Sequence, residues 1–465
     1  MTSRLPWTKF QDFYLRLGFL KVLAAALSSE RRSATNDSVV RRLERPLFDS
    51  VSVHPALAER TANLFASSYP RKTSSGKQID CPEVAEALIA AGPGGSALYG
   101  ITRDTAYKIL DWGHDVELVG RANQITERGL LLKSLLPRDR TDQFLTGDVA
   151  AWDPFQLDLR ERLFFTFHLL ETDLLTVELV GDLGALAPEK VLETRDAARM
   201  TCAALFRILK ASEKTTESRD IPAYRVALDL ALTMADEVDA DVPPGWANHA
   251  RQIRVSRSHK SAGRRALKAH GHNRPPRKTT KNADHQTIPR FEQLVDLGFV
   301  TKPKTDGESE VSDLAARRRW RYVPTEACRQ WSHATRTGVQ PWSSFATVAV
   351  GAFHRKAQKP GVAIQTQTVG ERLWAAYSAV GRSVGLSPVD SVALRAMLDA
   401  ASEGVPLEME TVHQFLLMIK ERNILTDCVF FASGNSLDKM FIRLKPTFPQ
   451  RLVEALGELP SEITK

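Results

Sequence analysis

Apolar residues recur at helical spacing along most of the chain, and short alternating runs follow several of the predicted helices. The clearest case lies near the C-terminus, where apolar positions predict helices over 388–401 and 407–422. Extended segments at 428–431 and 440–444 then flank the turn-forming sequence Ser-Gly-Asn-Ser. The pattern therefore predicts two helices followed by a β-hairpin.

A similar order occurs twice earlier in the chain. Residues 288–297 have helical spacing, Gly298 ends that helix, and extended segments at 299–300 and 320–324 precede a helix from Thr325 or Glu326. Residues 101–113 also predict a helix, and Ile-Thr-Glu-Arg-Gly at 125–129 predicts a short strand and the start of the next helix. Three segments thus share one pattern of residue types.

The order of helix, strand, polar wing, returning strand and helix resembles the winged-helix family of DNA-binding domains. The resemblance implies that the helix before the hairpin enters the major groove and that the wing reaches toward phosphate or the minor groove. In the middle segment it gives these wing residues a phosphate-facing role: Lys302, Lys304, Arg317, Arg318, Arg319 and Arg321. Alternation along the returning strand predicts that Trp320 and Tyr322 face the helices while Arg319 and Arg321 face outward. Winged helices also serve as protein-docking modules, and the same wing carries Asp306, Glu308, Glu310 and Asp313.

A chain of 465 residues is too long for one core, so several domains are expected. We predict a mainly α, multi-domain protein with repeated winged-helix modules, each with a small β-hairpin, around a helical scaffold block. The predicted segments are an N-terminal helical or helix-turn-helix-like unit (1–80), a first module (81–140), a helical scaffold (141–245), a basic flexible linker (246–285), a second module (286–336), a connector (337–368) and a third module (369–465).

The positive charge is concentrated in one segment. The chain has 63 Lys and Arg against 55 Asp and Glu, and without the eleven basic residues between Arg251 and Ala283 the balance becomes 52 against 55. Those residues, among which no acid occurs, are Arg251, Arg254, Arg257, Lys260, Arg264, Arg265, Lys268, Arg274, Arg277, Lys278 and Lys281. Such a segment cannot bury enough apolar surface to fold alone, and it suits either a phosphate-binding arm or a solvated tether between domains.

The apolar run from Leu17 to Leu27 is too short to span a bilayer, and aromatic residues before it favour a buried helix over a signal peptide. The four cysteines are scattered without a CxxC pair, so neither a disulfide framework nor a zinc ribbon is predicted. We therefore expect a cytoplasmic protein without a membrane partner.

Candidate enzyme chemistry is sparse. The sequence has no GxxxxGK[ST] phosphate loop and no GxSxG motif, and the pair His270 and His272 has no nearby Cys or carboxylate for zinc. Asp111, Asp115 and Glu117 are the nearest fragment of a Mg²⁺ nuclease site, and charged residues closing a helix explain them as well.

We therefore predict a non-catalytic protein that binds double-stranded DNA without a cofactor and has partner subunits. Its several modules fit an adaptor or recognition subunit of a larger bacterial assembly, such as an antiviral defence, restriction or mobile-element system. The alternatives are a protein–protein scaffold, in which winged helices dock subunits, and a divergent metal-dependent nuclease.

Overall fold

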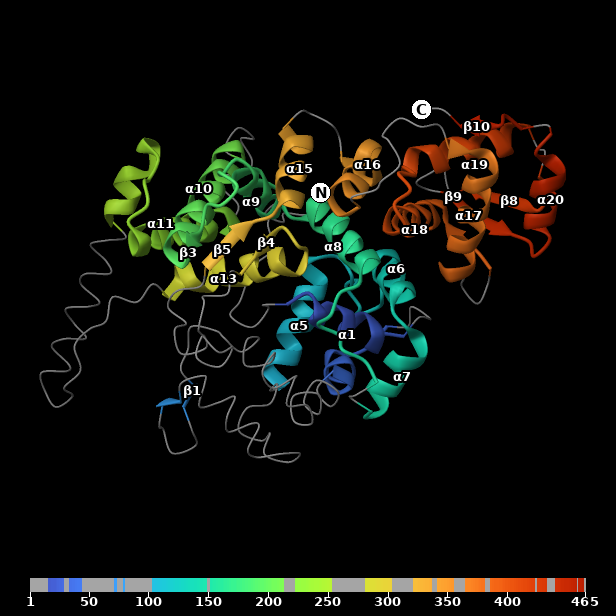
Figure 1. The fold of residues 1–465 in the computed structure, drawn as a ribbon. Helices are drawn as coiled ribbons and strands as arrows, with labels where there is room; N and C mark the ends of the chain where they lie inside the picture. Colours follow the sequence, from blue (N-terminus) through green and yellow to red (C-terminus); the bar gives the residue numbers. More distant parts are fainter. Residues whose placement is uncertain are drawn as a thin grey trace, which may run out of the picture. The chain divides into compact units, whose positions relative to one another are not determined.

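The protein is mainly helical, with small antiparallel sheets of two or three strands (Figure 1). The computed structural model describes residues 16–28, 33–43, 71–72, 78–79, 103–148, 151–212, 222–252, 281–302, 321–336, 341–354, 364–380, 385–422, 425–432, 440–457 and 459–463. The chain divides into two compact units. Unit 1 comprises Met1–Arg16, Val51–Gly100 and Leu169–Thr325, and unit 2 comprises Leu17–Ser50, Ile101–His168 and Glu326–Lys465.

The first part of unit 2 is built around a short apolar helix, α1 (Gly18–Ala26), that is buried along its whole length. The apolar run at the start of the chain is thus a core helix, as its aromatic neighbours predicted. A second short helix follows at residues 36–43. The remaining helices of this part are α5 (Arg103–Asp115), α6 (Glu127–Leu135), α7 (Arg138–Thr146) and the start of α8 (Leu159–Thr172).

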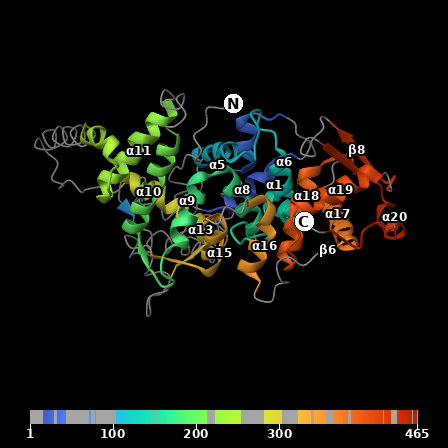
Figure 2. The same cartoon turned by 90° about the horizontal axis from the view of Figure 1, so that it is seen from above.

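The C-terminal part of unit 2 confirms the helices and the hairpin predicted there. The predicted helices correspond to α18 (Val389–Ser402) and α19 (Met409–Arg422), and the hairpin to β8 (Cys428–Ala432) and β9 (Met440–Leu444). An upstream strand, β7 (Ser387–Pro388), also pairs with β9, so the sheet order is β7-β9-β8. Helix α17 (Thr366–Val380) precedes β7, and α20 (Phe448–Ala455) follows the hairpin. These helices lie together beside β8 in Figure 2, and their apolar residues form one core.

Unit 1 has the same kind of connectivity. The order is α9 (Leu174–Gly184), β3 (Leu192–Glu193), α10 (Thr194–Ser212), α11 (Pro222–Val238), α13 (Lys281–Asp296), β4 (Val300–Thr301) and β5 (Arg321–Pro324). Strand β5 lies between the other two, so the sheet order is β3-β5-β4. A separate two-stranded sheet joins β1 (Arg71–Lys72) and β2 (Gln78–Ile79).

Two of the helix-to-hairpin junctions are built in the same way. After α5 the chain turns through Glu117 at a φ of 59°, and after α13 it turns through Gly298 at a φ of 79°. The Thr126 Oγ1 hydroxyl donates to the Glu117 carbonyl, and the Thr325 Oγ1 hydroxyl donates to the Gly298 carbonyl, each at 2.7 Å. In both cases the threonine N–H also donates to the carbonyl of the residue after the turn. A left-handed residue and a hydrogen-bonding threonine therefore close both hairpins.

The structure divides the chain differently from the predicted segments. The predicted scaffold contributes β3, which pairs with β5 of the second predicted module. The predicted linker contains η2 (Pro244–Trp246), a helix at 247–252 and the first residues of α13. The predicted connector contains α16 (Pro341–Phe353) and β6 (Ile364–Gln365), and β6 pairs with β10 (Glu462–Ile463). Helix α15 (Glu326–Arg336), which follows β5, belongs to unit 2.

Candidate nucleic-acid interface

Four of the predicted DNA-contacting residues belong to the described part of the chain. Arg251 is exposed in the helix at 247–252, and Lys281 is the first residue of α13. Lys302 is exposed just after β4, and Arg321 is half-buried at the start of β5. The structure does not describe the others, which are Arg254, Arg257, Lys260, Arg264, Arg265, Lys268, Arg274, Arg277, Lys278, Lys304, Arg317, Arg318 and Arg319.

Lys302 is not simply a solvent-facing wing residue. Its Nζ lies 2.5 Å from Oε1 of Glu292, whose side chain is buried in α13. The buried Tyr322 hydroxyl donates to the same carboxylate oxygen at 3.3 Å. Burial and the neighbouring Glu292 raise the pKa of Tyr322 well above its ordinary value, so the phenol stays protonated and remains a donor. The charge of Lys302 is therefore engaged within unit 1.

The predicted alternation along the returning strand holds for its described residues. Tyr322 is fully buried while Arg321 is half-buried. Arg321 lies opposite Glu193 in the β3–β5 register, which brings a carboxylate from the neighbouring strand to its side of the sheet. Trp320 and Arg319 lie outside the described residues.

Helix α13 holds the position that the winged-helix resemblance assigns to the groove-binding helix, but Arg290, Glu292 and Asp296 on it are buried. Arg290 is buried, forms an ion pair with Asp173 and donates to Thr176 Oγ1 at 3.0 Å. Asp296, at the C-terminal end of the helix, accepts from Arg16 Nε at 2.6 Å. Residues of unit 1 itself therefore engage these charges. The burial argues against the expectation that this helix reads DNA.

Helix α19 holds the equivalent position in the C-terminal part of unit 2 and is amphipathic. Its buried side includes Val412, Phe415, Leu416 and Ile419. Its exposed side chains are Glu410, Leu417, Lys420, Glu421 and Arg422. The apolar periodicity predicted this division, and no sequence signal favoured α19 over α13 as a contact surface.

The β8–β9 hairpin beside α19 has one face packed on the core and one face turned away from it. The inner face includes Cys428, Met440, Ile442 and Leu444. The outer face carries Val429 opposite Arg443 and Phe431 opposite Phe441. Phe431 is 39% exposed, and the Arg443 guanidinium lies 5.5 Å from the centre of its ring. Sequence analysis did not single out this pair, because its two members are twelve residues apart and meet only through the strand register.

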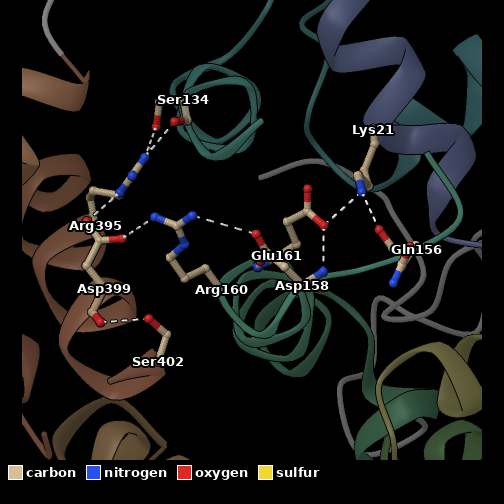
Figure 3. Close-up of polar contacts among 9 residues, drawn as sticks. All are labelled: Lys21, Ser134, Gln156, Asp158, Arg160, Glu161, Arg395, Asp399 and Ser402. Atoms are coloured by element: carbon tan, nitrogen blue, oxygen red, sulfur yellow. Dashed lines mark hydrogen bonds and ion pairs between the residues drawn. The ribbon is translucent and has the colours of Figure 1, made fainter. Parts of the chain in front are cut away.

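A buried ion pair anchors α8 to α1 in unit 2 (Figure 3). Lys21 Nζ donates to Glu161 Oε2 at 2.8 Å and to the Gln156 carbonyl at 2.9 Å, and the exposed fractions of the Lys21 and Glu161 side chains are 1% and 3%. Lys21 also lies over the ring of Trp152 at 5.2 Å from its centre. Burial raises the pKa of Glu161, and the Lys21 charge opposes that rise.

The same end of α8 also contacts α18 (Figure 3). Arg160 Nη1 lies 3.8 Å from Asp399 Oδ1, and Asp399 accepts from Arg395 Nε at 2.7 Å. Arg395 then donates to the carbonyl and hydroxyl oxygens of Ser134 in α6 at 2.7 and 2.9 Å. Polar contacts therefore join the first and last helical parts of unit 2, which are more than 200 residues apart in the sequence.

The candidate nuclease residues lie at the end of one helix and in the turn that follows it. Asp111 and Asp115 lie in α5, and Glu117 forms the left-handed turn after it. No group of three or more His, Cys, Asp or Glu in the described ranges is arranged to hold a metal ion. Burial raises the pKa of the Cys202, Cys328 and Cys428 thiols to about 12 in each case, which leaves them protonated and unreactive. The pair His270 and His272, and Cys81, lie outside the described residues.

No helix in the described part of the chain is long and apolar enough to cross a membrane. Comparison of the chain with protein families, with curated proteins and with solved structures found no match.

Proposed function

We propose that this chain is a non-catalytic, duplex-DNA-binding protein built from winged-helix modules. The observation that carries the proposal is the sheet order. A helix, a short strand, further helices and a hairpin follow one another in each unit, and the last strand of the hairpin lies centrally, as β3-β5-β4 and β7-β9-β8. This connectivity resembles that of a winged helix and supports the proposal, and helix-turn-helix proteins place their recognition helix in the major groove.

A third module fits the start of unit 2. The backbone N–H of Ala34, just before the helix at 36–43, donates to the Ala122 carbonyl at 3.0 Å. An isolated bridge joins Val119 and Ile125 after α5. The order is therefore α1, an extended segment, a helix, α5 and a very small hairpin. The extended segment takes the place of β3 and β7 in the other modules.

The modules do not contribute equally to the proposed contact. Arg290, Glu292 and Asp296 of α13 are buried, whereas the side chains of Lys420 and Arg422 near the C-terminal end of α19 are exposed. We therefore assign the DNA-facing helix to the C-terminal module. The basic segment between Arg251 and Lys281 is the second contact, because it carries eleven basic residues and no acidic residue.

Binding of the purified chain to a 30-base-pair duplex at several salt concentrations tests the proposal. Each phosphate neutralised adds about 0.9 to the slope of log affinity against log salt. Replacing six arm residues with Gln should flatten that slope by several units; these are Arg257, Lys260, Arg264, Arg265, Lys268 and Arg274. The matched control replaces six exposed basic residues elsewhere, namely Arg121, Arg138, Arg140, Lys190, Lys210 and Arg225. If the slope changes equally in both variants, the basic segment is a tether between domains and not a specific DNA contact.

The α19 contact is tested with a second pair of variants. Lys420→Ala with Arg422→Ala should weaken duplex binding about tenfold or more, since each charged contact to DNA contributes on the order of 1 kcal/mol. Arg138→Ala with Arg140→Ala, on α7, removes the same exposed charge and should leave binding unchanged. Failure of the unaltered chain to bind duplex at low salt would overturn the function itself. Metal-dependent plasmid cleavage lost in Asp111→Ala would instead favour a nuclease.

A protein-docking scaffold is the second candidate function. The observation in its favour is the buried and internally paired α13, with Lys302 engaged by Glu292. A module with this arrangement suits a role in holding other parts of an assembly. On this hypothesis the chain is an adaptor subunit of a larger bacterial complex, such as a defence or mobile-element system. Purification from its native source with stoichiometric partner proteins and no bound DNA would favour the scaffold.

A further inference from the structure

The outer face of the β8–β9 hairpin combines exposed aromatic surface with positive charge. Phe431 and Phe441 are direct cross-strand neighbours, and Arg443 occupies the next position on the same face. The exposed fraction of Phe431 is 39%, and the Arg443 guanidinium lies over its ring. No acidic residue occurs among the described residues of the two strands. The face therefore suits a partner that is both aromatic and anionic.

Other features of the hairpin keep this face in a fixed geometry. The inner side chains of both strands are buried in the core, which fixes which side chains point outward. On the opposite, core-facing side of the hairpin, Lys420 of α19 donates to Met440 Sδ at 3.6 Å, so a cation of the proposed DNA-facing helix contacts the same hairpin. The aromatic face and the exposed end of α19 thus belong to one module.

Single-stranded nucleic acid meets both requirements of such a face. Every nucleobase has a flat π surface that stacks on an aromatic ring, and its phosphates attract arginine. We infer that the outer face of the β8–β9 hairpin stacks unpaired nucleobases, with Phe431 as the platform and Arg443 as the neighbouring cation. The inference rests on the proposed function and extends it, because it makes unpaired bases beside a duplex, and not duplex alone, the preferred partner.

Binding of the full chain to a fluorescently labelled twelve-nucleotide oligothymidylate tests the inference. Loss of one base stack should weaken binding about tenfold in Phe431→Ala, while Phe431→Tyr, which keeps a ring, should retain nearly full affinity. Val453→Ala is the matched control, because Val453 of α20 is also an exposed apolar residue, at 59%. Thermal melts of all variants establish that each is folded.

A spectroscopic readout separates stacking from simple charge attraction. Phe431→Trp should show additional tryptophan emission that is quenched by the oligothymidylate, beyond any quenching in the unaltered chain. Equal affinities of Phe431→Ala and the unaltered chain, or no added quenching, would overturn the inference. If the unaltered chain binds duplex but not the oligothymidylate, the inference fails and the proposed function stands. If it binds neither, both fail.

Discussion

The buried pair of Lys21 and Glu161 gives the sharpest stability prediction. Lys21→Met removes the cation and leaves a carboxylate whose side chain is 3% exposed. Breaking a buried ion pair by removing one partner costs about 3–5 kcal/mol. At about 2–4 °C per kcal/mol for a unit of this size, the melting temperature should fall by about 6–20 °C.

The cost should depend on pH in a definite direction. Burial already raises the pKa of Glu161, and loss of the opposing Lys21 charge raises it further. At a pH above the ordinary Glu pKa, Glu161 is ionised in the unfolded chain. In the folded variant the same carboxyl either keeps its proton or is ionised in a buried site without a cation, and both cases cost free energy. The stability lost in Lys21→Met should therefore grow as the pH rises from about 4.5 toward neutrality.

Differential scanning calorimetry at pH 5 and pH 8 measures this effect. Lys21→Met with Glu161→Gln should recover much of the stability at pH 8, because no buried charge remains. Arg138→Met is the control, since Arg138 pairs with Asp142 at 4.0 Å with side chains that are 92% and 67% exposed, and this pair should contribute less than about 1 kcal/mol. If the single and double Lys21 variants melt together at pH 8, the ion pair does not account for the stability.

Two further predictions test residues in α8 and α6 of unit 2. Burial lowers the pKa of His168 to about 4 from 6.5. As the pH falls below 6.5, the unfolded chain binds a proton that the folded chain excludes, so the free energy of unfolding should fall by about 3 kcal/mol between pH 6.5 and pH 4. His168→Gln should flatten that acid limb in urea titrations, and an unchanged limb would contradict the assignment. A Cβ on Gly129 would lie 2.4 Å from the Leu118 carbonyl oxygen, so Gly129→Ala should cost about 1–3 kcal/mol. Gly181→Ala, whose Cβ meets nothing within 4 Å, should be neutral or stabilising, and equal melts for the two would refute the packing argument.

The local elements of the C-terminal module could be predicted because their signal is local. Helices α18 and α19 each have more than three turns of apolar periodicity, and the two hairpin strands flank a recognisable turn. Helix α13 shows the limit of such signals. It continues through Pro289, where the sequence suggested a helix start, and it begins at Lys281.

The first strand of each sheet could not be predicted in the same way. Strands β3 and β7 have two residues each, too few for any alternation to be visible. Strand β3 pairs with a segment more than 120 residues further along the chain. Pairing over such a distance depends on the packing of the intervening helices and leaves no trace in a short window of sequence. The predicted scaffold and second module consequently share one sheet in the structure.

The candidate contact surface was harder to predict than the fold, because charge pairing decides it. The hairpins of unit 1 and of the C-terminal module each carry a basic residue near the strand ends, and sequence analysis assigned a phosphate-facing role to Lys302 and none to Arg443. The structure distinguishes them by their neighbours. Lys302 meets the carboxylate of Glu292, whereas Arg443 lies over the exposed ring of Phe431. Two hairpins of one connectivity therefore place their basic residues in different surroundings, which depend on residues distant in the sequence.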